Sequence, residues 1–457
     1  MSTPVSLVHL GCARNLIDSE LILARLAEEG LVVAGRVEDA RIAVLNTCSF
    51  IGPARKESED AIRSLVKRKR RGELDAVVVA GCLVQRFQRT LEARFPDVDL
   101  FAEISDYSAL ASAVHGLTTG ASVPRYLAAG GLRAAEREGS RLLSTPGSYA
   151  YMRISHGCDH LCAFCAIPGI RGKHRSKSLE ALVAEAIELR AAGVAELVLV
   201  AEDSTAWGRD LGRDVDLSDL VRALADLPGG DEDQQPRIRI MYAYPHRFPW
   251  GLAELLRDHP RVVPYIDIPT QHVSTPVLRA MRRAGSGEAV REILDRLREE
   301  VPGLTLRSTL LVGFPGETEA DIELLSDFVE SYGLGRLGAF TYSEEEGTHG
   351  ASLPDDVPED VKAARLARVL AARDNALRAG QTALAGTTLE VLVDESHLSV
   401  EDDGEPSLAY AVGRTPMDAP EVDPFVVVLE CEAPIGSRLA VTIESVDDEF
   451  NLIGRPA

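Results

Sequence analysis

The sequence lacks the features of a membrane-bound or exported protein. It contains no apolar run of about 18 residues, so we expect no membrane-spanning helix. Its first residues include no basic segment followed by an apolar stretch, so no signal peptide is predicted. Internal repeats and long low-complexity segments are absent as well. We therefore expect a cytoplasmic protein with reduced thiols, whose seven cysteines are metal ligands rather than disulfides.

Positive charge is also scarce. The 457 residues include 49 Lys and Arg against 71 Asp and Glu, which gives a formal net charge of −22. This excess of negative charge argues against a general nucleic-acid binder and is compatible with a basic protein partner. The hydrophobic content of 45% and the charged content of 26% are those of an ordinary soluble protein. The length is sufficient for two or three domains with ample cores.

Three cysteines lie close together in the stretch HGCDHLCAFCAIPGIRG. Cys158, Cys162 and Cys165 form a C-x3-C-x2-C run. A 4Fe–4S cluster takes one Cys for each iron, so three thiolates leave one iron open. An open iron suits the chemistry in which S-adenosylmethionine chelates the iron and is cleaved by one electron. We therefore interpret this run as a cluster site.

The alternative for this run is a zinc site, with His156 or His160 as the fourth ligand. Structural zinc sites usually combine two paired-ligand knuckles, and the sequence contains no second C-x2-C motif. The spacing, together with Phe164 just before the third Cys, resembles the signature of the radical S-adenosylmethionine superfamily. We therefore favour the cluster over zinc.

Three further cysteines each close a short apolar run. Cys12 ends SLVHLGC, Cys48 ends IAVLNTC and Cys82 ends AVVVAGC, and a helical stretch follows each run. Repeated strand–turn–helix units predict a parallel α/β sheet, in which the carboxyl ends of the strands face the ligand crevice. Three Cys at such ends predict a second three-Cys cluster site. The alternative is three buried structural cysteines, which is the reading that we adopt for the isolated Cys431.

From residue 149 onward, candidate strands alternate with helical segments, which predicts a partial barrel of six β/α units. Barrel sites are assembled at the carboxyl ends of the strands, where the C-x3-C-x2-C loop would lie. The candidate strands span residues 151–155, 196–200, 237–242, 264–268, 306–312 and 336–342.

Two acidic residues follow the second of these strands, within AEDSTAWG. Glu202 and Asp203 are candidates for binding the amino group of S-adenosylmethionine. Capping of a helix by Asp203 or Ser204 is an equally good reading for either residue alone. After the fourth strand, Gln271 and His272 are candidates for the same site, although a single His at a strand end is often structural.

The stretch VGFPGETEAD follows the fifth strand and contains Gly313, Gly316 and Glu317. The two glycines would permit close backbone approach to a ligand, and we include Glu317 among the candidate cofactor contacts. A strand–helix turn with Thr318 as the N-cap explains the same residues. Arg307, in the strand itself, could neutralise a carboxylate or be solvated.

The chain ends in a small, acidic region. Residues 355–383 predict a helix, and after it four short strand-like runs predict a small antiparallel β-barrel. Residues 388–457 contain 16 Asp and Glu against 3 Lys and Arg, a balance of −13. Gripping a phosphate backbone requires clusters of Lys and Arg. The acidic residues, including the stretch EDDGEPS that begins at Glu401, therefore suggest docking of a basic partner.

Taken together, these motifs resemble the methylthiotransferase family of radical S-adenosylmethionine enzymes from end to end. HLGCARNLIDSE is similar to the GCPKNLVDSE of the RimO-like branch. DIPTQHVS is similar to the QHIS form of that branch, where the MiaB-like, tRNA-acting branch usually carries QSGS. RLGAFTYSEEEGT and VPEDVKAARLARVL resemble its barrel end and following helix. Three positions depart from the pattern, because Ala13 and Arg14 replace Pro-Lys and Glu202 stands where Gln is common.

This resemblance implies an α/β fold of three domains joined by one linker. An N-terminal methylthiotransferase domain spans residues 1–118, a linker 119–143, a radical core 144–383 and a TRAM domain 384–457. It also implies two 4Fe–4S clusters, one on each Cys triad, and S-adenosylmethionine bound at the open iron of the Cys158 triad. A 5′-deoxyadenosyl radical would remove hydrogen from the β-carbon of an aspartate. The auxiliary cluster would supply sulfur and a second S-adenosylmethionine the methyl group.

The implied substrate is a basic small-subunit ribosomal protein, the S12-type protein of the decoding centre. A flavodoxin or ferredoxin would supply electrons, and neither a membrane nor a nucleic acid is expected as a direct partner. Two alternatives remain: a tRNA adenosine methylthiotransferase, and a non-enzymatic iron–sulfur scaffold or electron carrier.

Overall fold

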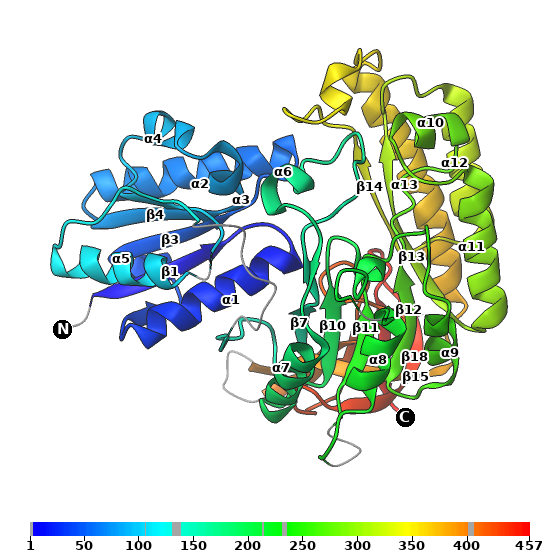
Figure 1. The fold of residues 1–457 in the computed structure, drawn as a ribbon. Coiled ribbons are helices and arrows are strands. Elements are labelled where there is room, and N and C mark those ends of the chain that lie inside the picture. The colour runs from blue at the N-terminus through cyan, green and yellow to red at the C-terminus, as the bar shows by residue number, and fades with distance from the viewer. Residues whose placement is uncertain (1–2, 106, 130–138, 213, 231–234, 401–405) are drawn as a thin grey trace.

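Two parallel sheets and one small barrel make up the chain (Figure 1). The computed structural model describes residues 3–105, 107–129, 139–212, 214–230, 235–400 and 406–457. Residues 130–138 of the expected linker, and the acidic Glu401, Asp402, Asp403 and Glu405, lie outside this described part. No helix within it is long and apolar enough to cross a membrane.

The N-terminal sheet confirms the three predicted strand–turn–helix units and adds three short strands. All of its strands are parallel, in the order β2-β1-β3-β4-β5-β6. The added strands are two or three residues long, too short to give a recognisable pattern in the sequence, and β6 lies within the segment expected as linker. The bounds are β1 Pro4–His9, β2 Val32–Ala34, β3 Ile42–Thr47, β4 Ala76–Gly81, β5 Leu100–Ala102 and β6 Tyr126–Leu127.

Helices cover both faces of this sheet, as a buried parallel sheet requires. Alternate residues of β3 show the two faces, because Val44 packs in the core that includes α1 and α5, whereas Leu45 packs in the core that includes α2. The segment after Cys82 was expected as one helix, but the chain breaks at Gln88, where φ is +48°. The bounds are α1 Ala13–Glu28, α2 Gly52–Arg70, α3 Cys82–Phe87, α4 Thr90–Arg94 and α5 Ser108–Thr119, with a 3-10 turn, η1, at Val37–Asp39.

The central sheet is the predicted partial barrel, with six parallel strands in the order β14-β13-β12-β11-β10-β7. Its strands are β7 Tyr149–Arg153, β10 Glu196–Val200, β11 Arg237–Ile240, β12 Val262–Asp267, β13 Thr305–Val312 and β14 Leu337–Thr341. The helices that accompany it are α6 Ile167–Arg171, α7 Leu179–Ala191, α8 Leu217–Ala225, α9 Gly251–Asp258, α10 Thr275–Ala280, α11 Gly287–Glu300, α12 Glu319–Ser331 and α13 Glu359–Thr382. Two 3-10 turns, η2 Ser204–Ala206 and η4 Gly350–Ser352, complete this region.

The C-terminal strands form a closed barrel in the order β15-β16-β17-β19-β18. Its pairs are antiparallel except for β17 and β19, which run parallel. Four of the strands were predicted, and the fifth, the Gly- and Pro-containing β19, was not. Cys431 is buried in the core of this barrel, as a structural cysteine would be. The bounds are β15 Thr388–Val400, β16 Pro406–Arg414, β17 Val426–Leu429, β18 Arg438–Val446 and β19 Leu452–Pro456.

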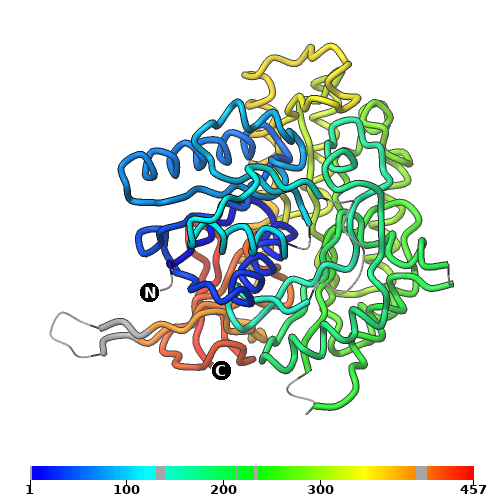
Figure 2. The backbone as a smooth tube through the Cα atoms, turned by 60° about the vertical axis from the view of Figure 1, so that its left-hand side comes forward, coloured from blue at the N-terminus to red at the C-terminus, as the bar shows by residue number. Residues whose placement is uncertain are grey.

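The C-terminal barrel lies at the N-terminal ends of the central strands (Figures 1 and 2). Residues 415–423, which we call the plug loop, close that end of the partial barrel. The carbonyl oxygen of Pro416 accepts a hydrogen bond from Arg239 at 3.0 Å, and Asp418 accepts one from Arg336 at 2.7 Å. The hydroxyl of Tyr265 donates to Asp423 at 2.6 Å. The barrel floor is therefore completed by the last domain of the chain.

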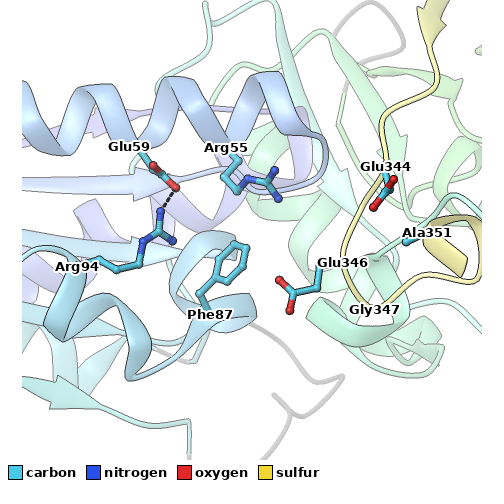
Figure 3. Close-up of a pocket in the computed structure, with 8 residues that line it drawn as sticks. All are labelled: Arg55, Glu59, Phe87, Arg94, Glu344, Glu346, Gly347 and Ala351. Atoms are coloured by element: carbon cyan, nitrogen blue, oxygen red, sulfur yellow. Dashed lines mark hydrogen bonds and ion pairs between the residues drawn. The ribbon is translucent and has the colours of Figure 1, made fainter. Parts of the chain in front are cut away.

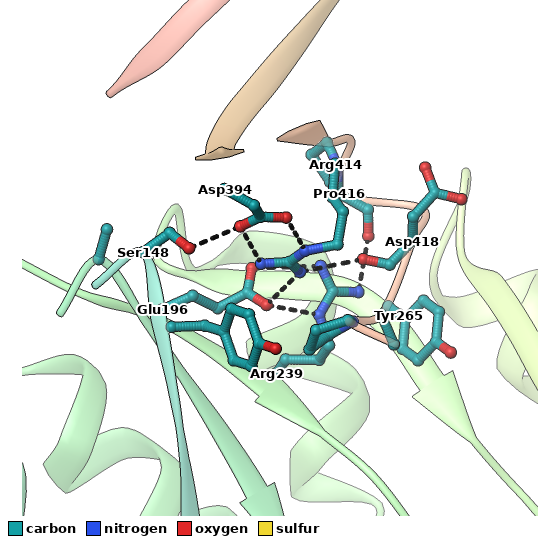
Figure 4. Close-up of polar contacts among 12 residues, drawn as sticks. Ser148, Glu196, Arg239, Tyr265, Asp394, Arg414, Pro416 and Asp418 are labelled. Atoms are coloured by element: carbon teal, nitrogen blue, oxygen red, sulfur yellow. Dashed lines mark hydrogen bonds and ion pairs between the residues drawn. The ribbon is translucent and has the colours of Figure 1, made fainter. Parts of the chain in front are cut away.

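A buried ionic network fixes this junction (Figure 4). Arg414 of the C-terminal barrel donates to Glu196 at 2.9 Å and to Asp394 at 2.6 Å, and Arg239 also pairs with Glu196 at 2.9 Å. Burial opposes ionisation of Glu196, but the guanidiniums of Arg239 and Arg414 lower its pKa to about 2. Since this pKa lies below the usual value of 4.5, the carboxylate stabilises the fold above pH 4.5 and loses that contribution as the pH falls toward 2.

Removal of Arg414 should therefore be costly. We expect Arg414→Met to lower the free energy of unfolding by about 3 kcal/mol, because it leaves two buried carboxylates short of a partner. The control is Arg455→Met, since Arg455 pairs with Glu430 and Glu444 while 41% of its side chain is exposed. Its loss should be below about 1 kcal/mol. Urea titration at neutral pH measures both, and equal losses would contradict the assignment.

Candidate functional site

The N-terminal triad forms where three adjacent strands end. Cys12 caps α1 after β1, Cys48 follows β3, and Cys82 begins α3 after β4. Gly11 lies directly against Cys48, since a Cβ added there would be 3.2 Å from the Cys48 sulfur. Burial raises the pKa of Cys48 to about 11, and Cys82 and Cys12 are close enough to contribute to the rise. The three thiols therefore meet, as the strand-end positions indicated.

Two arginines lie against this triad. Burial opposes ionisation of Cys12, but the guanidiniums of Arg14 and Arg171 hold its pKa below the usual value. Arg171 also donates to the sulfur of Cys82 at 3.3 Å. Positive charge therefore lies beside Cys12 and Cys82, where it would favour thiolate ligands, although burial still raises the pKa of Cys82.

The second triad lies on a loop that is held at both ends. Two short strands, β8 Ser155–His156 and β9 Arg175–Ser176, pair and bring the ends of the loop together. Gly157 is required there, because a Cβ would be 2.2 Å from the carbonyl oxygen of Lys173. Within the loop, Ala163 bonds to the backbone of Met281 at 2.8 Å and of Gly350 at 2.6 Å. The loop geometry is therefore set by its neighbours in the barrel.

Burial raises the pKa of both Cys158 and Cys165 to about 12. A thiol in this setting ionises only when a cation, such as a bound iron, supplies positive charge. Phe164 is half-buried and packs against the small core that surrounds Met281 and Tyr342. The aromatic residue in the signature therefore supports the loop from beneath.

The structure disfavours the zinc alternative for this loop. His160 is already engaged, because its Nε2 is 2.8 Å from Asp203 and its ring stacks on Tyr244 with centroids 3.7 Å apart. Within the described residues, no three His, Cys, Asp or Glu side chains are grouped as ligands of a single metal ion. A 4Fe–4S cluster instead distributes its thiolates over separate irons.

The two triads face one another across a small group of charged side chains. The positive charge of Arg14 favours the thiolate form of Cys12 in the first triad and of Cys165 in the second, so Arg14 lies close to both. Glu202 lies between Arg14 and Arg171, 4.0 Å from the Nε of each. Its side chain is 3% exposed, and neither carboxylate oxygen has a hydrogen-bond partner. A buried carboxylate without a hydrogen bond is a group that a ligand could partner.

Asp18 of α1 fixes the N-terminal domain to the barrel beside this group of charged side chains. It accepts a hydrogen bond from Arg153 of β7 at 2.9 Å and one from Arg171 of α6 at 2.8 Å. The carboxylate is fully buried, as is Arg153. Because Arg171 also contacts Cys82, one network joins the first triad to the loop that carries the second.

A second junction lies at the barrel mouth. Glu345, 1% exposed, pairs with Arg55 at 3.3 Å and with Arg86 at 2.7 Å, both from the N-terminal domain. Figure 3 shows the adjoining pocket of about 450 Å³, with Phe87 facing Glu346. The N-terminal sheet is thus held at two separated points.

The other predicted acidic and polar residues at the mouth form hydrogen bonds within the protein, unlike the carboxylate of Glu202. Asp203 accepts hydrogen bonds from His160 and, at 2.6 Å, from Thr205, and it does not cap the following turn with its side chain. His272 is fully buried, and its Nδ1 accepts the backbone amides of residues 273 and 274. Gln271 adopts φ +68° and bridges to β13 through its backbone.

The stretch after β13 is tied to α13. Gly313 has φ +74°, and a Cβ there would be 2.4 Å from Lys362, so the close approach is to a side chain of the protein itself. Gly316 has open space around it. Glu317 is fully buried, bonded to the Gly313 amide at 2.8 Å and to Arg365 at 3.0 Å.

The expected N-cap at Thr318 is confirmed, with a capping box completed by Asp321. Arg307 is not solvated. It neutralises Asp267 at 3.1 Å and lies 3.4 Å from Asp423 of the plug loop.

Sequence reasoning gave no site role to Arg14, Asp18, Arg153 or Arg171. Arg14 was noted only as a departure from a family pattern, and Arg171 lies six residues beyond Cys165. Their proximity to Cys in the sequence was the one available signal.

Comparison with known proteins gives the class to which this fold and site belong. The Radical SAM superfamily model matches residues 152–329 and the TRAM domain model residues 385–456. Residues 4–103 match the uncharacterized protein family UPF0004. A partial barrel with a three-Cys loop after its first strand is thus a radical S-adenosylmethionine domain, a class that uses a 4Fe–4S cluster and S-adenosylmethionine.

Curated relatives narrow the class to one family. A protein of Trichlorobacter lovleyi named ribosomal protein uS12 methylthiotransferase RimO is 40% identical, over 97% of this chain and 96% of its own. Proteins of the same name from Anaeromyxobacter sp. (strain K) and Geobacter sulfurreducens are 41% and 38% identical, over 93% and 98% of their lengths. The chain belongs to the RimO family of radical S-adenosylmethionine methylthiotransferases.

Solved structures agree on the fold. The radical S-adenosylmethionine methyltransferase TsrM of Kitasatospora setae, solved with cobalamin and a [4Fe-4S] cluster, has a TM-score of 0.55. It is 16% identical, with 75% of each chain covered. The cobalamin-dependent enzyme OxsB has a TM-score of 0.51 at 14% identity, with 81% of this chain and 56% of OxsB covered.

Proposed function

We propose that this enzyme methylthiolates the small-subunit ribosomal protein S12, the substrate that the names of its relatives give for them, at the β-carbon of an aspartate. The observation that carries the proposal is the meeting of two Cys triads across Arg14, Glu202 and Arg171. In the reaction, a C–H bond at the β-carbon is replaced by a C–S bond to a methylthio group. Such an exchange needs a site for hydrogen removal beside a site for sulfur.

The donor chemistry of the two triads fits 4Fe–4S clusters. Each triad offers three free thiols and would leave one iron open. We assign one cluster and S-adenosylmethionine to Cys158, Cys162 and Cys165, and a second cluster to the N-terminal triad. When bound, these groups supply the radical, sulfur and methyl chemistry of the reaction.

The protein's own residues would hold and orient these groups. Glu202, whose oxygens lack hydrogen-bond partners, is suited to the ammonium of S-adenosylmethionine. Arg14 and Arg171 place positive charge beside the thiols of the N-terminal triad. The remaining candidates would shape the mouth around the cofactor; they are Phe164, Asp203, Gln271, His272, Gly313, Gly316 and Glu317. Arg307 is held by Asp267 and by Asp423 of the plug loop, toward the opposite end of the barrel. The plug loop, whose residues 418–420 are buried, limits access of water from the opposite end.

The charge of the TRAM domain supports a basic protein as the substrate. Its three cations are all engaged: Arg414 is buried in the network of Figure 4, Arg438 bonds to backbone oxygens of the radical core, and Arg455 pairs with Glu430 and Glu444. Binding of an RNA backbone would need free cations. Exposed acids of this domain can instead attract a basic ribosomal protein.

We further propose a cytoplasmic enzyme with the domain limits 1–118, 144–383 and 384–457, joined by a linker at 119–143. A flavodoxin or ferredoxin would reduce it.

The substrate assignment has a direct test. We expect the reconstituted enzyme, with dithionite and S-adenosylmethionine, to add a methylthio group to the isolated S12 protein, detected by mass spectrometry. Unmodified tRNA assayed in parallel should remain unchanged. Methylthiolation of the tRNA with S12 untouched would instead establish the MiaB-like activity. Absence of 5′-deoxyadenosine in every reaction would leave a non-enzymatic iron–sulfur protein.

Iron content tests the cluster assignment. Anaerobic reconstitution should give about eight irons per chain, four for each cluster. The triple Ala variant of Cys158, Cys162 and Cys165 should retain about four irons and form no 5′-deoxyadenosine. Cys431→Ala is the matched control and should retain the full iron content. Full iron in the triple variant, or a zinc ion in its place, would rule out the assignment.

A third experiment separates radical generation from sulfur insertion. The triple Ala variant of Cys12, Cys48 and Cys82 should still cleave S-adenosylmethionine, because its remaining triad lies in the radical core. It should yield no methylthio product. Normal product formation would remove the N-terminal triad from the mechanism.

A further inference from the structure

The loop of the second triad presents an apolar side chain to solvent. Leu161, directly beside Cys162, is 69% exposed, more than any other large hydrophobic side chain in the described residues. Single exposed apolar side chains are common on protein surfaces, so the position of this one on the Cys158 loop is what matters. This one lies one residue from a cluster ligand.

Four exposed cations lie on or next to segments that contact this loop. Arg279 and Arg282 lie at the end of α10, where Met281 bonds to Ala163 of the loop. Lys173 follows the residue whose carbonyl oxygen accepts the Cys158 amide. Arg247 lies three residues beyond Tyr244, on which His160 stacks.

None of these four cations forms an ion pair in the described part of the chain. In a protein with a formal charge of −22, such a concentration of unpaired positive charge is unusual. The nearby acids do not cancel it by pairing, since they bind backbone amides instead. Asp159 accepts the amide of His174 at 3.1 Å, and Asp210 accepts that of Ser176 at 2.9 Å.

The surface is also rigid. His160 is fixed by Asp203 and by stacking on Tyr244. Arg283 lies over the same tyrosine ring at 4.4 Å and reaches to 3.8 Å from the Cys162 sulfur. A surface held in this way is formed before any partner arrives, which favours rapid, reversible contact.

We propose that this basic face around Leu161 docks a small acidic one-electron carrier protein. The proposal rests on the function above, because only a redox-active site here would need such a partner. One electron passes from the carrier, which is oxidised, to the iron–sulfur site held by Cys158, Cys162 and Cys165, which is reduced. No bond or proton moves in this step. The contact is expected to be small and sensitive to salt, as transient redox complexes are.

Reversal of two of the cations tests the docking face. In R279E/R282E we expect at least about tenfold weaker binding of oxidised flavodoxin, measured by fluorescence titration of the holoenzyme without S-adenosylmethionine. The KM for reduced flavodoxin in 5′-deoxyadenosine formation should rise by a similar factor. High salt should weaken flavodoxin binding by the wild-type enzyme until it approaches that of the variant. With dithionite, a small reductant that needs no docking face, the variant should match the wild type.

Two further variants locate the effect. R36E/R368E makes the same change in net charge at exposed arginines elsewhere and should bind flavodoxin normally. L161A should weaken binding several-fold with no change in charge.

Unchanged flavodoxin binding in R279E/R282E would overturn the proposal. So would an equal loss in R36E/R368E, an equal loss of the dithionite-driven rate, or a loss of RNA binding with flavodoxin binding intact. Failure of the wild type with dithionite would refute the proposed function instead, so the two outcomes are distinguishable.

Discussion

The contact of Asp18 with Arg153 and Arg171 is the interaction on which the site depends. It joins a helix of the N-terminal domain to the first barrel strand and to the helix after the Cys158 loop. Since Arg171 also touches Cys82, any displacement of the two domains would change the separation of the two triads. In the proposed reaction, chemistry shared between the two triads would require that separation to be constant, and a fully buried ion pair with short hydrogen bonds provides this.

The same device recurs at the other domain junctions. Glu345 holds two arginines at the barrel mouth, and Glu196 holds two at the barrel floor. Buried ion pairs contribute little net stability, because desolvation offsets much of their attraction, but they penalise every arrangement in which one partner is missing. We therefore interpret these pairs as setting the relative placement of the domains. Apolar contacts supply the stability, through cores that extend from α1 to the inner side of β7 and β12.

Much of the architecture could be predicted from the sequence. The long apolar runs, each ending in Cys or a polar loop, specified three strands of the first sheet and all six of the second. Strands as short as β6 carry no periodicity, and β19 contains Gly and Pro, so neither was visible. The Cys triads were predictable because their ligands are defined by residue type and strand position. Arg171 was not, since its role arises only when a distant domain packs against it.

Candidate residues at the barrel mouth show the same limit. His272 and Glu317 occupy promising positions at strand ends, yet both are fully buried and bonded within the protein. Glu202 and Asp203 are neighbours in sequence, but only the carboxylate of Asp203 accepts hydrogen bonds, whereas that of Glu202 has two arginines at 4.0 Å. Position at a strand end predicts that a residue is near the site. Its hydrogen-bond partners, which depend on the packed fold, determine whether it is free to bind.

The plug loop has a consequence for synthesis of the protein. Chains emerge from the ribosome N-terminus first, and domains generally fold in that order. Arg239, Arg307 and Arg336 belong to the radical core, but their partners Pro416, Asp423 and Asp418 are made much later. A nascent chain that ends before the plug loop therefore has an open barrel floor, in which Arg239 and Arg307 have their core partners Glu196 and Asp267 but Arg336 lacks Asp418. The core therefore reaches its final packing at this end only when the last domain has been made.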